Sequence, residues 1–76
     1  MYYKTLAKKL TSDNWSITDT KRGQVYQKPA HYIKFERADG AKTVEIVTSC
    51  NRDGTPGEIL TTWIDGLNAK LYNLKI

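Results

Sequence analysis

The chain has 76 residues, of which 39% are hydrophobic and 26% are charged, and its net charge is +4. This size and composition predict a single folded domain over residues 1–76, too small to hold a deep cavity for a small-molecule substrate. Cys50 is the only cysteine, which excludes an intramolecular disulfide and favours a reducing, cytoplasmic environment. The sequence has no run of about 20 apolar residues, so we expect no membrane association.

The first quarter of the chain predicts a helix and then a strand. Residues 2–12 favour a short amphipathic helix, because apolar side chains recur at helical spacing. These positions are Tyr3, Leu6, Ala7 and Leu10. Ser12–Asn14 is typical of a turn, and Trp15–Thr18 alternates apolar with polar residues, as a half-buried strand does. Residues 21–29 contain three basic residues, one Gly and one Pro, and we expect an exposed loop there.

Residues 30–49 predict a β-hairpin. Asp39-Gly40 is a strong signal for a two-residue type I′ turn. Counting outward from that turn pairs Ala38 with Ala41 and places Phe35 opposite Val44. It also places Ile33 opposite Ile46, Tyr32 opposite Val47 and Lys34 opposite Glu45. This register gathers the apolar residues on one face, and a slip of one residue would scatter them.

A second helix is predicted after a turn at residues 51–54. Thr55 can serve as N-cap, Pro56 suits the first helical position, and Glu58 can complete a capping box. Apolar residues then follow at helical spacing, so we expect a helix from Pro56 to Asn73. These apolar positions are Ile59, Leu60, Trp63, Ile64, Leu67, Leu71 and Leu74.

Together these elements predict the order α-β-β-β-α. The expected fold class is α+β, a two-layer sandwich in which two helices cover a three-stranded antiparallel sheet.

The charge is uneven along the chain. Residues 1–42 hold nine Lys and Arg against four acids, whereas residues 43–76 hold three against four. A basic first half favours nucleic acid as a partner, since Lys and Arg neutralise phosphates and tyrosines stack on unpaired bases. The residues expected to bind nucleic acid or another partner are Lys21, Arg22, Tyr26, Lys28, His31, Tyr32 and Lys34.

The same tyrosines suit a protein interface, which is the alternative reading. Tyrosine and arginine are common anchors at interfaces, and an open sheet face or edge can accept a partner. These tyrosines are Tyr2, Tyr3, Tyr26, Tyr32 and Tyr72. One histidine, His31, and one cysteine are too few for a zinc site. We therefore expect no catalytic residues, no metal and no cofactor.

The element order is similar to that of the double-stranded-RNA-binding domain. Pro29-Ala30-His31 looks like the Gly-Pro-x-His loop of that family, with Lys28 in place of the Gly. The resemblance implies that His31 contacts a minor groove. The basic run that begins the second helix of that family is replaced here by Gly54–Glu58, which contains no basic residue.

The size and layout also resemble small phage-encoded inhibitors, including anti-CRISPR proteins, which occupy the surface of a host nuclease. The sequence thus predicts a non-catalytic binding domain, first for nucleic acid. The alternative is a protein-binding inhibitor or accessory factor of a phage or mobile element.

Overall fold

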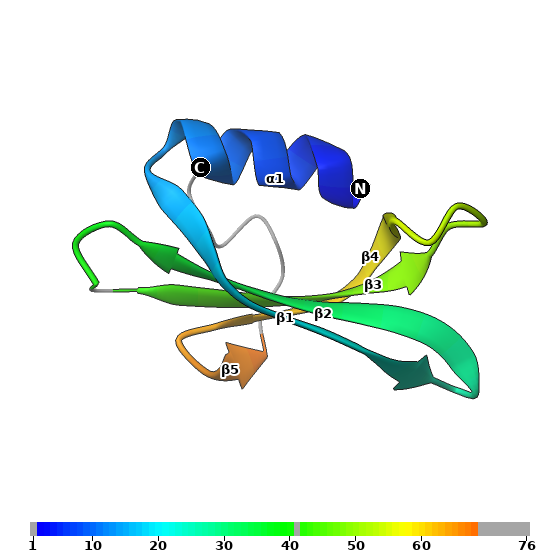
Figure 1. Cartoon of the computed structure of the whole chain (residues 1–76). Helices are drawn as coiled ribbons and strands as arrows, with labels where there is room; N and C mark the ends of the chain where they lie inside the picture. Colours follow the sequence, from blue (N-terminus) through cyan, green and yellow to red (C-terminus); the bar gives the residue numbers. More distant parts are fainter. Residues whose placement is uncertain (1, 41, 69–76) are drawn as a thin grey trace.

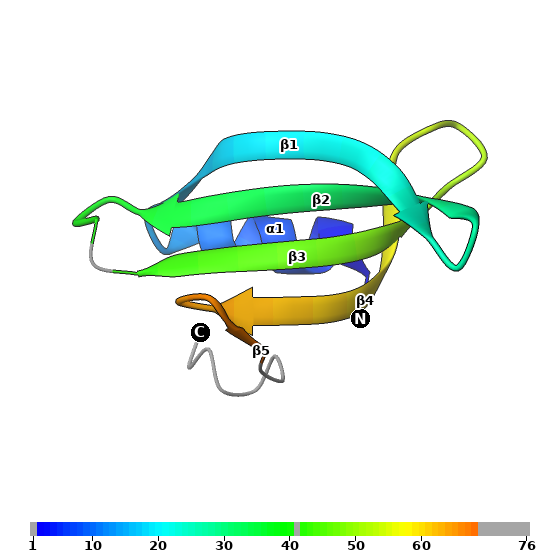
Figure 2. The same cartoon turned by 90° about the horizontal axis from the view of Figure 1, so that it is seen from below.

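In the computed structural model, which describes residues 2–40 and 42–68, a single helix packs on an antiparallel sheet (Figure 1). The elements are α1 (Tyr3–Ser12), β1 (Trp15–Val25), β2 (Lys28–Arg37), β3 (Thr43–Cys50), β4 (Pro56–Ile64) and β5 (Leu67–Asn68). The strands lie in chain order across the sheet, so every pair is a hairpin. Figure 2 views the sheet with α1 behind it, and α1 covers one face of the sheet.

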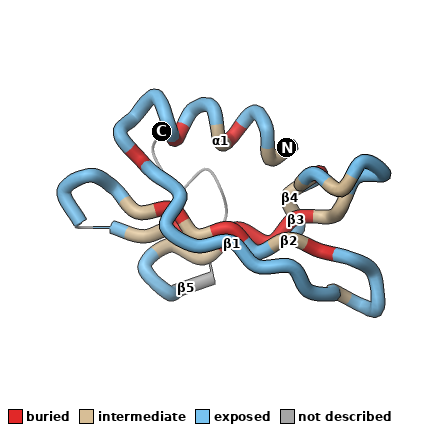
Figure 3. Tube along the Cα trace, in the orientation of Figure 1, coloured by how far each residue is buried: buried red, intermediate tan, exposed pale blue. Residues whose placement is uncertain are grey.

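The core lies between α1 and the centre of the sheet. Leu6 and Leu10 of α1 are fully buried, as the helical spacing predicted, and Trp15 closes the core where β1 begins. The sheet contributes Ile33, Phe35, Val44 and Ile46. Figure 3 shows the buried residues gathered in this layer, whereas β1 is exposed along almost its whole length.

The register of the central hairpin is confirmed. Phe35 pairs with Val44, Ile33 with Ile46, Tyr32 with Val47 and Lys34 with Glu45. The predicted type I′ turn is wrong, because only Gly40 and not Asp39 has a positive φ. The N–H of Gly40 donates to the carbonyl of Arg37 at 2.8 Å instead. Ala41, predicted to pair with Ala38, lies outside the described residues.

The predicted second helix is wrong. Residues 56–64 form β4, which pairs with β3, and β5 follows after a tight turn at Asp65-Gly66 with φ values of 52° and 82°. Thr55 caps no helix, since its hydroxyl donates to the Asp53 carboxylate at 2.6 Å. The rest of the predicted helix, residues 69–73, lies outside the described residues. So do its apolar positions Leu71 and Leu74 and the predicted interface residue Tyr72.

The fold class is corrected accordingly. The described residues form one helix and a sheet of four long strands with a two-residue fifth, rather than two helices on three strands. The order α-β-β-β-α fails, and with it the layout shared with the double-stranded-RNA-binding domain. The predicted loop at 21–29 is also wrong, because β1 and β2 continue through it to a two-residue turn at Tyr26-Gln27. No described helix is long and apolar enough to span a membrane.

Candidate functional site

The face of the sheet opposite α1 carries a mixed aromatic and charged surface, which we call the open face. Its members share that face because cross-strand partners point the same way. Between β1 and β2, Asp19 is opposite Lys34 and Lys21 is opposite Tyr32. Glu45 of β3 is opposite Lys34 of β2 on one side and Trp63 of β4 on the other. The open face consists of Asp19, Lys21, Tyr32, Lys34, Glu36, Glu45, Val47 and Trp63.

Two aromatic residues, Tyr32 and Trp63, lie near the apolar centre of the open face, Val47. Val47 is only 3% exposed although it lies opposite the helix side, so its neighbours on the open face cover it. The Tyr32 ring leans over the backbone of Gly23, where a Cβ would come within 3.0 Å of Tyr32 Cε2. Tyr32 remains 38% exposed and Trp63 is half-buried. A shallow hollow of about 200 Å³ lies between Tyr32, Trp63 and the charged side chains.

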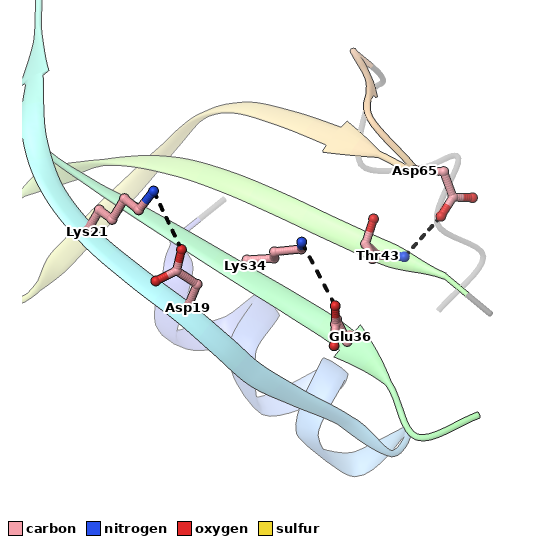
Figure 4. Close-up of polar contacts among 6 residues, drawn as sticks. All are labelled: Asp19, Lys21, Lys34, Glu36, Thr43 and Asp65. Carbon is pink, nitrogen blue, oxygen red and sulfur yellow. Dashed lines mark hydrogen bonds and ion pairs between the residues drawn. The ribbon is translucent and has the colours of Figure 1, made fainter. Parts of the chain in front are cut away.

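The charges of the open face are locally balanced. Lys21 lies 3.7 Å from the Asp19 carboxylate, and Lys34 lies 3.9 Å from that of Glu36 (Figure 4). Glu45 adds a further acid opposite Lys34. All these side chains are exposed enough for water and salt to screen them, so the pairs add little stability. A ligand would therefore meet alternating charges rather than a positive field.

Two of the predicted binding residues lie on the other side of the sheet. Arg22 and His31 are cross-strand partners on the helix side, beyond the end of α1. A terminal nitrogen of Arg22 lies 3.7 Å from the Cys50 sulfur. His31 Nε2 lies 2.9 Å from the carbonyl oxygen of Gly54. A carbonyl only accepts, so Nε2 carries the proton and His31 ties β2 to the loop after β3.

The tip of the β1–β2 hairpin holds the last two predicted residues. Tyr26 has a φ of 50° and is 94% exposed, and Lys28 begins β2 immediately after the turn. The seven predicted residues are thus divided. Lys21, Tyr32 and Lys34 share the open face, Arg22 and His31 lie on the helix side, and Tyr26 and Lys28 lie at the tip.

Two groups of residues were missed by the sequence analysis. Trp63 was assigned to a helix, although the β-branched residues around it and the turn signal Asp65-Gly66 could have placed it in a strand. Lys4, Lys8 and Lys9 project from α1, which contains no acidic residue.

A second hollow, of about 670 Å³, separates α1 from the loop between β3 and β4. Tyr2, Tyr3 and Lys4 line one side and Asn51 and Asp53 the other. Hydrogen bonds from the hydroxyl and the N–H of Thr55 hold the pKa of Asp53 below its usual value. These bonds keep the carboxylate engaged within its own loop.

The described residues contain no group of three His, Cys, Asp or Glu side chains that could hold a metal ion. The side chains of His31 and Cys50 have separate partners, Gly54 and Arg22. The site therefore offers shape, aromatic surface and paired charges, which suit binding.

Comparison with known proteins gives no relative from which a role could be transferred: no family model, no curated protein and no solved structure matches this chain.

Proposed function

We propose that this chain is a non-catalytic protein-binding domain, and that its open face holds a partner protein. The observation that carries the proposal is the pair of aromatic rings, Tyr32 and Trp63, around a hollow on the sheet face that α1 leaves uncovered. Large aromatic side chains dominate the energy of protein interfaces, and charged residues belong to their rims.

The size of the hollow and the local charges favour a protein over other ligands. At about 200 Å³ it is smaller than the roughly 300–1,000 Å³ of small-molecule pockets. It suits one anchoring side chain of a partner. The paired charges, Lys21 with Asp19 and Lys34 with Glu36, favour a surface that carries both signs over a polyanion. Holding a partner's surface is what an inhibitor or accessory factor of a mobile element would do. We include a cytoplasmic location in the proposal, because a chain with one cysteine forms no internal disulfide and suits a reducing environment.

The test compares two exposed tyrosines. Tagged chain would be incubated with nuclease-treated lysate, and captured proteins identified for wild type, Tyr32→Ala and Tyr26→Ala. We expect one partner to be lost with Tyr32→Ala, because removing an interface anchor costs about 2 kcal/mol or more, roughly 30-fold in Kd. Tyr26→Ala, at the hairpin tip, should retain it. Equal capture by both variants, or no protein surviving nuclease treatment, would refute the proposal.

Nucleic-acid binding is the second candidate, and the lysines of α1 favour it. Lys4, Lys8 and Lys9 project from a helix without acids. The test is a titration of a labelled single-stranded oligonucleotide at low salt. Binding through α1 should be lost in Lys4→Glu/Lys8→Glu and kept in Lys21→Glu/Lys34→Glu, and the log–log salt slope should fall by roughly 0.7 per lost contact. Absence of binding by the wild type at low salt would exclude this candidate.

A further inference from the structure

Within residues 2–40 and 42–68, no strand lies beside the outer edge of β1. β1 is the first strand in the sheet order, and among the described strands its one neighbour is β2. Residues 16–24 of β1 are all exposed, and Ile17 is 52% exposed. The opposite edge is shorter, because β5 lies beside the end of β4 and Tyr2 forms a bridge to Glu58 near its start. An uncovered strand of this length presents unpaired backbone donors and acceptors to any second strand.

We propose that β1 joins two copies of this chain, strand to strand and antiparallel. The two-fold axis lies where Thr20 of one copy faces Thr20 of the other, and we call this an axis at Thr20. The charges of β1 itself select this partner and this register. In an isologous contact, residue i faces residue j and j faces i. Directly opposed residues share a face of the joined sheet. At the axis a residue must therefore face its own copy, because its neighbour in sequence points to the other face.

The available registers differ in the charges that they oppose. An axis at Asp19 sets two carboxylates face to face, an axis at Lys21 sets two ammonium groups together, and an axis at Arg22 opposes two guanidinium groups. An axis at Gly23 opposes no unlike charges. Only the axis at Thr20 places Asp19 opposite Lys21 of the second copy, and it does so twice by symmetry. Opposite charges on directly facing residues stabilise a strand pair, and like charges destabilise it.

The structure already presents these groups together. Asp19 and Lys21 lie on the open face, 3.7 Å apart and exposed. In the dimer each carboxylate would lie beside its own lysine and opposite that of the second copy, so that four charges alternate. A two-fold axis perpendicular to the sheet keeps both copies of α1 on one side. The two open faces then lie side by side on the other.

A bulge at Thr18, between the pairs of Ile17 and Asp19, limits the pairing. The regular ladder begins at Asp19, so by symmetry about Thr20 only three residues of each copy, 19–21, would form regular pairs. Such a contact is small, and small interfaces are usually weak and transient. We therefore expect a monomer–dimer equilibrium that depends on concentration rather than a permanent dimer.

The test exchanges the two charges. Sedimentation equilibrium of the full chain should show wild type moving from the chain mass of 8.7 kDa towards twice that value as concentration rises to about 1 mM. Asp19→Lys and Lys21→Asp should each weaken the dimer by roughly tenfold or more, because two attractive pairs become two repulsive ones. The double variant Asp19→Lys/Lys21→Asp should restore it.

Mixing the two single variants gives a result that a folding defect cannot imitate. Asp19→Lys carries lysines at both positions and Lys21→Asp carries aspartates at both. We therefore expect the mixture to form a heterodimer that is tighter than either homodimer, resolved by mass in native mass spectrometry. Asp39→Lys is the matched control, since it removes the exposed 3.8 Å ion pair with Arg37, which lies where β2 ends and away from the β1 edge. It should dimerise as wild type does.

Charges and bulges also keep natural edge strands from pairing. If β1 is protected in this way, the wild type stays monomeric at every concentration and the mixture forms no heterodimer, which would overturn the proposal. A wild-type dimer insensitive to both single variants would overturn it too, because another surface would then be responsible.

Discussion

Gly57→Ala distinguishes the observed strand from the helix that the sequence predicts, because the two structures give opposite signs. In a helix, alanine is more favourable than glycine by up to about 1 kcal/mol, so the substitution would raise the melting temperature. In the structure, Gly57 is buried in β4. A Cβ added there would lie 2.6 Å from Asn51 Oδ1 and 2.7 Å from Ser49 Oγ.

The two side chains that this Cβ would crowd, Ser49 and Asn51, both form hydrogen bonds. Ser49 Oγ accepts the N–H of Glu58 at 2.9 Å, and the Asn51 amide donates to Thr55 and to the carbonyl of Pro56. Overpacking a filled site costs roughly 1–3 kcal/mol, and each lost hydrogen bond about 1 kcal/mol. We expect a loss of about 2–3 kcal/mol, which lowers Tm by roughly 8–24 °C in a domain of this size.

Thermal unfolding followed by circular dichroism measures the change, with urea unfolding as a second probe. Ser49→Ala combined with Gly57→Ala is the control. Removing the hydroxyl relieves one contact, so the double variant should lose less stability than the two single losses added together. A Tm for Gly57→Ala equal to or above that of wild type would refute both the crowding and the strand.

Three further predictions test the turn, the core and the pH dependence. Gly66 has a φ of 82°, so Gly66→Ala should lower Tm and Gly66→Asn should lower it less, because Asn tolerates this conformation. Leu10 is fully buried, and Leu10→Ala should cost about 2–5 kcal/mol, visible as a lower urea midpoint. Burial raises the pKa of Tyr3 above 10.0. The unfolded chain therefore loses this proton at a lower pH than the folded chain does, and the free energy of unfolding falls as pH rises past that value. Tyr3→Phe should make this fall smaller. Urea midpoints measured between about pH 8 and pH 11 test the prediction.

The central hairpin could be predicted because several independent features of its sequence agree. Apolar alternation, the facing of Lys34 with Glu45 and a turn signal in the middle all require one register, and that register is observed. The detail of the turn could not be predicted in the same way. An Asp-Gly pair permits a two-residue turn, but here the N–H of Arg37 donates to the carbonyl of Lys42 at 3.1 Å and closes a wider loop.

The helix prediction failed because its apolar spacing is compatible with two structures. Ile59, Trp63 and Ile64 fit a helical face, yet residues 59–64 are also rich in β-branched side chains, which favour strands. Asp65-Gly66 is the same turn signal that identified the central hairpin, and here it does form the two-residue turn. The capping pattern at Thr55 prevailed in the prediction, although Thr55 in fact bonds to Asp53.

The faces on which Lys21 and Arg22 lie follow from the bulge in β1, which sequence alternation does not reveal. Trp15 and Ile17 precede the bulge, and Ile17 is opposite Phe35 on the helix side. Uninterrupted alternation would place Asp19 and Lys21 on that side as well. The extra residue, Thr18, moves both to the open face.

The bulge therefore links the two proposed surfaces. It gives the open face the Asp19–Lys21 pair beside Tyr32, and it places that pair on the uncovered edge of β1, at the register that a second copy would need. A partner on the open face and a second copy at the edge would then contact neighbouring sides of the same two residues. Dimer formation is expected to change the affinity of the open face, and by linkage a bound partner would change the dimer equilibrium by the same factor.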